Sequence, residues 1–551
     1  MKIAIAQQNY HIGNFEANFS KMKMGMLEGK AQGADLVVFS ELSICGYSPR
    51  DFLEFQDFIN GCEAVIEQIK EVTKEIGIAA IVGVPTVNPV IEGKDLFNSA
   101  YCIAEGEIVH VAHKALLPTY DIFDEYRYFE PASTFEVFEF MGKRIALTVC
   151  EDIWNIANEN PLYTICPMDE LMPQHPDLMI NISASPFSYD HAADRMTVVR
   201  ANVERYGIPM IYCNATGAHT EVIFDGGSLV INDDAKVVDE LPYFKETVQT
   251  YEVDTLIKSA GRIVKDQLQD KSKMDLIYQA LLLGIQDYFG KLGFKKAILG
   301  LSGGIDSAIT CVLACHALGA ENVMAVMMPS QFSSDHSISD SEKLVKNLGC
   351  LSDTVPIQPA FEVMQKSLAT QFEGLPFNVT EENLQARVRG NFLMALSNKF
   401  GYIVLNTSNK SEAAVGYGTL YGDMCGGLSV IGDVYKTEVF ELCRWINRNG
   451  EIIPENIITK PPSAELRPNQ KDSDSLPDYA ELDAVLYQYI ELRKGPKEIV
   501  AMGFEEALVK RVLRLVNINE YKRYQTAPML RVSDKAFGIG RRMPIVGKYL
   551  S

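Results

Sequence analysis

The sequence lacks the marks of several large protein classes. Its 11 cysteines are odd in number and form no Cys-x-x-Cys pair, which disfavours a disulfide framework or a zinc site and indicates the reduced thiols of a cytoplasmic protein. Cys311 and Cys315 lie one helical turn apart, and we interpret them as core packing. No apolar run has the length needed to span a bilayer, and residues 1–7 indicate a buried strand rather than a secretion signal.

Basic residues are also scarce. Lys and Arg total 51 against 72 Asp and Glu, and the net charge is −21. Such a chain repels nucleic-acid phosphates, so a nucleic-acid partner is not expected. A length of 551 residues exceeds what one hydrophobic core supports, so two to three domains are expected.

Short apolar segments alternate with helical stretches. In the first half, strands mixed with helices predict an α/β layered sandwich. In the second half, a more regular alternation predicts a doubly wound parallel sheet with a nucleotide at the carboxyl ends of its strands. A polar segment at 256–272 predicts a linker between domains at 1–255 and 273–551. The predicted strands are 2–7, 35–40, 78–85, 98–104, 107–112, 144–150, 178–183, 209–214, 227–232, 296–301, 322–328, 353–358 and 402–406, with a hairpin turn at Glu105-Gly106; the predicted helices are 274–290, 305–318, 337–348 and 382–398.

A glycine-rich loop, Ser302-Gly303-Gly304-Ile305-Asp306-Ser307, follows one of these strands. Two glycines allow close approach of the backbone to a phosphate, and successive amides before a helix N-terminus form an anion-binding concavity. Ser302 and Ser307 can donate to phosphate oxygens, and Asp306 can hold the Mg²⁺ that neutralises them. Although the lysine of the common nucleoside-triphosphate loop is missing, these features indicate ATP as a cosubstrate.

This hexapeptide resembles the loop of the ATP pyrophosphatase family. The resemblance implies a Rossmann-like doubly wound domain that splits ATP between its α and β phosphates and activates a substrate oxygen as an adenylate. A bare Gly-Gly would indicate only a turn between a strand and a helix.

Three segments of the first half carry residues suited to cleaving an amide. Cys150 ends one predicted strand, Glu41 ends another, and Lys114 follows a third. A thiol needs a base to become a nucleophile, and Glu41 can accept its proton. The charge of Lys114 can stabilise the oxyanion that forms on the attacked carbonyl. A strand-end cysteine alone would more often be a core residue.

Together these segments resemble the Glu-Lys-Cys triad of the nitrilase (carbon–nitrogen hydrolase) family over roughly residues 1–250. Flanking residues 114–129 and 181–187 extend the resemblance. It implies an α-β-β-α sandwich and a pocket for L-glutamine. The residues implied to shape that pocket are Tyr47, Tyr120, Phe123, Glu151, Ser185 and His191, the last standing where the family usually has a lysine or arginine for the glutamine carboxylate.

Several segments of the second half, at 382–390, 407–412, 417–423 and 435–437, resemble the NAD synthetase family. With the nitrilase-like half, the resemblance is to glutamine-dependent NAD synthetases. It implies ATP contacts at Ser302, Gly303, Gly304, Asp306, Ser307, Met328, Thr407, Lys436 and Ser463; deamido-NAD contacts at Asn383, Glu412, Asp423 and Lys522; and a Mg²⁺ site at Asp306 and Glu412. Arg387 and Arg389 are expected near the phosphates. Ser408, His219 and Thr220 depart from the family pattern.

The expected reaction is ATP-dependent amidation of deamido-NAD with ammonia released from L-glutamine. The resemblance also implies a homo-oligomer, a dimer through the synthetase half or a larger assembly. The alternatives are another glutamine amidotransferase of the same nucleotide-loop family, such as GMP or asparagine synthetase, a tRNA-modifying enzyme, or an amidohydrolase whose second half only senses ATP. The internal Cys150 with Lys114 argues against the first, the net charge against the second, and the paired acids Asp306 and Glu412 against the third.

Overall fold

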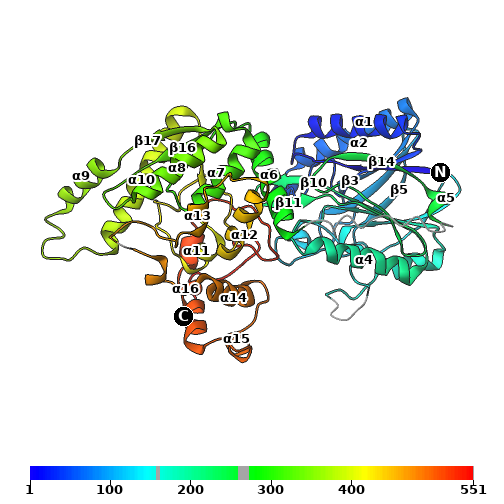
Figure 1. Ribbon diagram of the computed structural model, residues 1–551. Helices are drawn as coiled ribbons and strands as arrows, with labels where there is room; N and C mark the ends of the chain where they lie inside the picture. The colour runs from blue at the N-terminus through cyan, green and yellow to red at the C-terminus, as the bar shows by residue number, and fades with distance from the viewer. Residues whose placement is uncertain (157–161, 258–271, 469, 550–551) are drawn as a thin grey trace. The chain divides into compact units, whose positions relative to one another are not determined.

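The computed structural model describes residues 1–156, 162–257, 272–468 and 470–549 (Figure 1). The chain divides into two compact units, Met1–Lys271 and Ser272–Ser551. Most of the predicted linker, from residue 258 to residue 271, lies outside the described residues. Within the described ranges, no helix combines the length and apolarity needed to cross a membrane.

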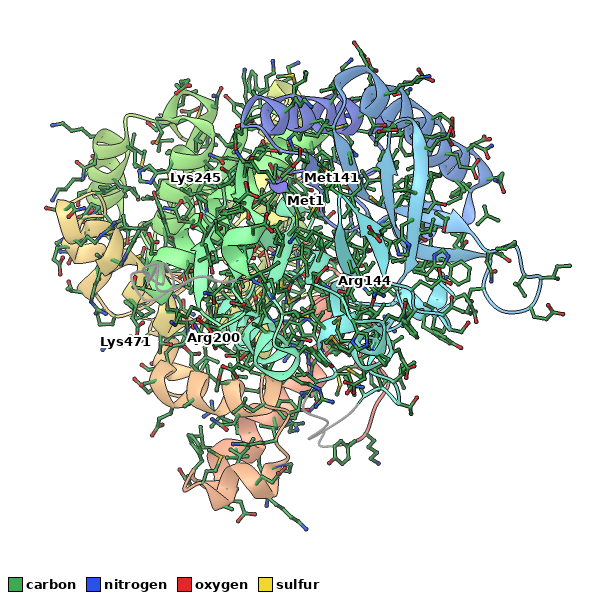
Figure 2. The ribbon with its side chains drawn as sticks, turned by 90° about the vertical axis from the view of Figure 1, so that its right-hand side faces the viewer. Met1, Met141, Arg144, Arg200, Lys245 and Lys471 are labelled. Atoms are coloured by element: carbon green, nitrogen blue, oxygen red, sulfur yellow. The ribbon has the colours of Figure 1, made fainter. Side chains whose placement is uncertain are left out.

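The first unit contains two six-stranded sheets, ordered β14-β1-β2-β3-β4-β5 and β13-β12-β9-β8-β7-β6. Helices α1 and α2 cover the outer face of the first sheet and α4 lies on the other side of the unit (Figure 1). Inward-facing apolar side chains such as Ile5 and Ile180 form a core between the sheets. Figure 2 shows the described side chains as sticks on the ribbon. This arrangement confirms the α-β-β-α sandwich.

The strands of the first unit are β1 (Lys2–Gln7), β2 (Leu36–Val38), β3 (Ala79–Val87), β4 (Leu96–Ala104), β5 (Glu107–His113), β6 (Phe138–Phe140), β7 (Lys143–Val149), β8 (Leu178–Ser183), β9 (Met210–Asn214), β10 (Thr216–His219), β11 (Val222–Asp225), β12 (Leu229–Ile231), β13 (Val237–Glu240) and β14 (Thr247–Glu252). Its helices are α1 (Phe15–Ala31), α2 (Gln56–Ile76), α3 (Pro167–Leu171), α4 (His191–Tyr206) and α5 (Val253–Leu256). The turn at Glu105-Gly106 joins β4 to β5, and both residues have the positive φ, 52° and 85°, that a tight hairpin turn requires.

The second unit contains a parallel five-stranded sheet in the order β17-β16-β15-β18-β19. The chain runs outward from β15 to β17 and then crosses to β18 on the other side of β15. The sheet is therefore doubly wound, and its switch point lies between β15 and β18. The loops that follow these two strands carry the glycine-rich hexapeptide and Thr407, so the order of the strands brings the two predicted ATP segments together.

The strands of the second unit are β15 (Ala297–Gly300), β16 (Val323–Met327), β17 (Leu351–Thr354), β18 (Ile403–Asn406) and β19 (Leu428–Ser429). Its helices are α6 (Lys273–Leu292), α7 (Ile305–Leu318), α8 (Asp335–Leu348), α9 (Gln358–Leu368), α10 (Val379–Phe400), α11 (Lys410–Val415), α12 (Lys436–Ile446), α13 (Glu455–Thr459), α14 (Tyr479–Ile490), α15 (Pro496–Ala501), α16 (Glu506–Ile518) and α17 (Glu520–Arg523).

The strand predicted at 353–358 is wrong over most of its length. The structure ends β17 at Thr354 and begins α9 at Gln358. Pro356 has no N–H to donate to a strand ladder, and Pro359 occupies the first turn of α9, where proline is favoured. Ile357, an apolar residue of the predicted strand, is buried in the turn instead.

Candidate active sites

In the first unit, Cys150 stands at a sharp turn between β7 and a short 3₁₀ helix, Cys150–Ile153. Its φ is +46°, a left-handed conformation that costs free energy for any residue except glycine. Asn181 of β8 stabilises the turn by donating to the Cys150 carbonyl (3.3 Å) and to Thr148 Oγ1 (3.0 Å).

Asp152 ties this turn to the segment that carries Lys114. Its carboxylate accepts hydrogen bonds from the backbone amides of Val149 (3.0 Å), Ala115 and Leu116 (2.9 Å each). Burial raises the pKa of Asp152 to about 6, while the backbone donors oppose that shift. Asp152 thereby fixes the turn that carries Cys150 relative to the segment that carries Lys114.

Lys114 is fully buried between two carboxylates. Its Nζ lies 2.7 Å from Glu41 Oε1 and 2.8 Å from Glu125 Oε1. Asn98 donates to Glu41 Oε1 (2.7 Å), and the Ala184 amide donates to Glu41 Oε2 (3.1 Å). Two acids and one lysine therefore form a closed hydrogen-bonded group, which is how buried charges are tolerated.

The charges of this group act on the thiol. Burial raises the pKa of Cys150, Glu41 raises it further, and Lys114 opposes both. The resting thiol therefore holds its proton at neutral pH. Although burial disfavours its charge, Lys114 has a raised pKa because Glu125 and Glu41 surround it, so it remains a cation. Burial raises the pKa of Glu125 to about 7.

Most residues predicted for the glutamine pocket gather around these groups. Tyr47 donates to Glu125 Oε1 (2.6 Å) and packs edge-on against Phe123. Tyr120 donates to Glu151 (2.9 Å) and also meets Phe123 edge-on. Burial raises the pKa of Glu151. Tyr47 also borders a cavity of about 300 Å³ whose lining includes the departures His219 and Thr220.

Ser185 and His191 meet at the start of α4. Ser185 Oγ lies 2.8 Å from His191 Nε2, and the imidazole stacks on Trp154 with ring centroids 5.2 Å apart. The Ser185 amide donates to Asn214 (2.9 Å). The Ser185 hydroxyl and the Trp154 indole thus fix the orientation of the His191 imidazole.

Sequence reasoning missed three contributors to this site. Glu125 lies within the flanking segment 114–129, where an acid two residues after Phe123 in a lysine-containing segment is a signal for a charge partner. Asn98 and Asp152 act through hydrogen bonds between distant segments, which leave no local signal in the sequence.

In the second unit, the glycine-rich loop turns tightly from β15 into α7. Gly303 has φ +80°, and a Cβ there would lie 2.4 Å from the Ser337 carbonyl oxygen, so only glycine fits. Ser307 Oγ donates to the Gly304 carbonyl (3.0 Å), and the Gly304 amide donates to Ser302 Oγ (3.2 Å). These bonds shape the loop at the N-terminus of α7, where the helix dipole favours an anion.

Beside this loop, Lys436 contacts both predicted metal ligands. Its Nζ donates to Asp306 Oδ2 and lies 3.5 Å from Glu412 Oε1. Asn409 donates to Asp306 Oδ1 (2.9 Å). Burial and the charge of Asp306 raise the pKa of Glu412 to about 8, and Asp472 adds to this shift. Lys436 therefore faces three acids, Asp306, Glu412 and Asp472, so the acids outnumber the lysine.

These groups border a cavity of about 310 Å³. The predicted residues in its lining are Ser302, Gly304, Asp306, Ser307, Met328, Thr407, Glu412, Asp423, Lys436 and Ser463. Gly303 is not part of the lining, but its close approach to Ser337 shapes the loop. Arg389 lines the cavity, donates to the Met328 carbonyl (3.1 Å) and has its pKa lowered to about 10 by burial, whereas Arg387 donates to the Leu420 carbonyl (3.2 Å) outside the lining.

Asn383 and Lys522 lie outside the cavity lining and contact the loop at 416–423. Asn383 Oδ1 accepts from Thr419 Oγ1 (2.7 Å), and Lys522 Nζ donates to the carbonyls of Gly416 (2.7 Å) and Gly418 (2.8 Å). Asp423 accepts from the Thr419 amide (2.6 Å). Three residues predicted for deamido-NAD thus converge on one loop.

The two units match two different families along the chain. Residues 2–262 match the family described as Carbon-nitrogen hydrolase, and residues 277–526 match the family described as NAD synthase. A solved glutamine-dependent NAD+ synthetase from Acinetobacter baumannii, in complex with adenosine diphosphate, is 37% identical with a TM-score of 0.77, covering 99% of this chain and 98% of that one. A second, from Cytophaga hutchinsonii, is 21% identical with a TM-score of 0.82, covers 99% and 98%, and supports the fold alone.

Whole-length relatives agree with this pairing. The glutamine-dependent NAD(+) synthetase of Synechocystis sp. is 45% identical over 550 residues, which cover 98% of each chain. That of Thermotoga maritima is 38% identical and covers 100% of this chain and 99% of its own. The chain therefore belongs to the glutamine-dependent NAD(+) synthetase family.

Proposed function

We propose that this enzyme converts deamido-NAD to NAD, the last step of NAD biosynthesis, by ATP-dependent amidation with ammonia from L-glutamine. AMP, pyrophosphate and glutamate are the other products. One observation carries the proposal: a single chain, similar to these synthetases over its whole length, holds a buried Glu-Lys-Cys group and a separate acidic cavity at a phosphate-binding loop. Residues 1–255 act as the glutaminase domain and residues 273–551 as the synthetase domain.

Glutamine cleavage begins at Cys150. Because burial keeps the thiol protonated, Glu41 accepts the proton as the sulfur attacks the side-chain carbonyl of glutamine. Lys114, held 2.7 Å from Glu41, stabilises the oxyanion by its charge. Glu41 then returns the proton to the leaving ammonia, and a glutamyl thioester remains on Cys150.

The second half-reaction releases glutamate. Glu41 takes a proton from water as the water attacks the thioester, and the Cys150 thiol is restored. Glu125 acts as a positioning residue because it fixes Lys114 (2.8 Å) without contacting the substrate in this scheme. Tyr47, Tyr120, Phe123, Glu151, Ser185 and His191 bind and orient glutamine.

The donor set in the second unit fits ATP with Mg²⁺. Mg²⁺ is usually held by one or two carboxylates together with phosphate oxygens, and Asp306 and Glu412 supply two carboxylates with one lysine between them. The raised pKa of Glu412, about 8, reflects buried negative charge that a cation relieves. When bound there, Mg²⁺ would neutralise phosphate charge.

The chain's own residues then position the acyl transfer. The loop from Ser302 to Ser307 and the N-terminus of α7 receive the phosphates, and Lys436 supplies positive charge beside them. Thr407, Met328 and Ser463 complete the ATP contacts, and Asn383, Glu412, Asp423 and Lys522 hold deamido-NAD. The nicotinate carboxylate attacks the α-phosphorus, pyrophosphate leaves, and ammonia displaces AMP from the acyl adenylate.

NAD formation with two nitrogen donors tests this assignment. The parent and Cys150→Ala are compared with deamido-NAD, ATP and Mg²⁺, using either glutamine or ammonium chloride. The variant is expected to lose glutamine-driven NAD formation and to keep ammonia-driven formation. If the active parent makes no NAD with either donor, the acceptor assignment fails. Cytoplasmic location and homo-oligomer formation stay predictions, and analytical ultracentrifugation of the parent tests the second.

A further inference from the structure

Three thiols of the second unit meet at a distance from the ATP site. Cys311 and Cys315 lie one turn apart on α7, and Cys350 precedes β17, the edge strand of the sheet. Their sulfur atoms all lie within 4.8 Å of one another. The sequence spacing of the first two favoured core packing, but the fold adds a third thiol that the sequence places 35 residues further along.

We propose that Cys311, Cys315 and Cys350 form a three-thiolate site for a soft, thiophilic metal ion of the Zn²⁺ or Cu⁺ class. Soft thiolate ligands select such ions over Mg²⁺. An ion with metal–sulfur bonds of about 2.3 Å would hold three sulfurs about 4 Å apart, so the observed separation closes with movements below about 1 Å. Among the described residues, no fourth His, Cys, Asp or Glu completes the group, which favours three-coordinate binding.

The thiols are accessible to a small ion. Thiolates are the form that binds a metal, so each thiol releases its proton to solvent when the ion binds. Cys311 is fully buried, whereas Cys315 and Cys350 keep 6% and 8% of their surface exposed, which gives a small ion a route from the sheet edge.

The ion would connect two parts of the nucleotide-binding core. Its ligands join the second half of α7 to the turn between α8 and β17. The other end of α7 begins at the glycine-rich loop. Binding therefore stabilises the helix whose N-terminus receives the phosphates, and the thermal unfolding midpoint is expected to rise when the ion is bound.

Metal content measured on the purified full chain tests the site. The reduced parent is incubated anaerobically with Zn²⁺, Cu⁺ or, as the hard-ion control, Mg²⁺, then desalted and analysed by mass spectrometry for bound metal. The parent is expected to retain one equivalent of a soft ion that Cys350→Ser does not retain. Cys166→Ser, which alters a partly exposed thiol outside the cluster, is expected to retain it. Alkylation mapping of the parent, which needs no variant, should show these three thiols protected by the ion.

Three results would overturn the proposal. The first is retention of one equivalent of the soft ion by Cys350→Ser. The second is failure of the parent to hold either soft ion in excess over Mg²⁺, with the three thiols alkylated equally with and without metal. The third is a disulfide that links Cys350 to Cys311 or Cys315 in the reduced, anaerobic preparation, which would make the group a redox pair instead. Zn²⁺ and Cu⁺ retention, compared at equal concentration, decides which ion the site prefers.

Discussion

The two sites of this enzyme each contain a buried lysine between two acids. They differ in the groups that surround these three side chains. In the first site, Lys114 lies between Glu41 and Glu125, and further hydrogen bonds from Asn98 and Tyr47 close the group. In the second, Lys436 serves Asp306 and Glu412, Asp472 adds negative charge, and the group borders a cavity of about 310 Å³.

The difference matches the charge of the substrate proposed for each site. The side-chain amide of glutamine is neutral, so in the proposed mechanism the first site needs only one cation, Lys114, for a transient oxyanion. ATP carries negative charge and in the proposed mechanism is accompanied by Mg²⁺, which the acids around Lys436 would hold. The raised pKa is higher in the second site. Burial raises the pKa of Glu125 to about 7, whereas burial together with the charge of Asp306 raises the pKa of Glu412 to about 8.

The largest effect is expected from Lys114→Met. Removing the cation leaves two buried carboxylates uncompensated, which costs about 3–5 kcal/mol of stability. Glutamine-driven NAD formation should fall about 10²–10³-fold or more because the oxyanion loses its partner, while the ammonia-driven rate per folded enzyme stays. Steady-state assays and denaturant unfolding measure both. Lys23→Met is the control, at a partly exposed lysine whose Nζ lies 3.9 Å from Glu75 Oε2, and equal losses in the two variants would contradict the role of Lys114.

Lys436→Met should affect both nitrogen donors. Because Lys436 lies beside the phosphate loop and the paired acids, its removal is expected to slow ATP–pyrophosphate exchange by about 10²-fold. Glutamine and ammonia reactions fall together, whereas release of glutamate from glutamine persists. Lys346→Met on the exposed face of α8 should behave as the parent. Loss of the glutamine reaction alone would contradict the assignment of Lys436 to the synthetase site.

The parts of each site that could be predicted from the sequence are those that lie at strand ends. Cys150, Glu41, Lys114 and the glycine-rich loop each follow a strand, so hydrophobic periodicity placed them at the edges of sheets. Hydrogen-bond partners such as Asp152 could not be predicted, because they join segments far apart in the chain. The misplaced strand at 353–358 shows a related limit, since a buried turn residue and a strand residue are equally apolar.

The pH dependence of stability tests the group around Lys436, because Glu412 has a higher pKa, about 8, than Glu125 of the other group, about 7. A raised pKa means that folded Glu412 holds its proton more tightly than the unfolded chain does, so its contribution weakens stability as pH rises from about 4.5 to about 8. Glu412→Gln should therefore flatten the upper part of that decline, by a few degrees in the unfolding midpoint. Mg²⁺ should flatten the decline in the parent. Glu342→Gln on the exposed face of α8 is the control, and a decline identical in all three proteins would contradict this account.

The smallest expected effect concerns how the first site recognises glutamine rather than how it cleaves it. His191 stacks on Trp154 and contacts Ser185 (2.8 Å), and the family resemblance of the sequence implies a lysine or arginine for the glutamine carboxylate at this position. In His191→Arg, a planar guanidinium can keep the stacking contact and adds a permanent charge. The KM for glutamine is expected to fall about fivefold, equivalent to ~1 kcal/mol, with kcat and the ammonia-driven rate unchanged. A fall in kcat without a change in KM would place His191 among the groups that orient Cys150 instead of among those that bind the substrate.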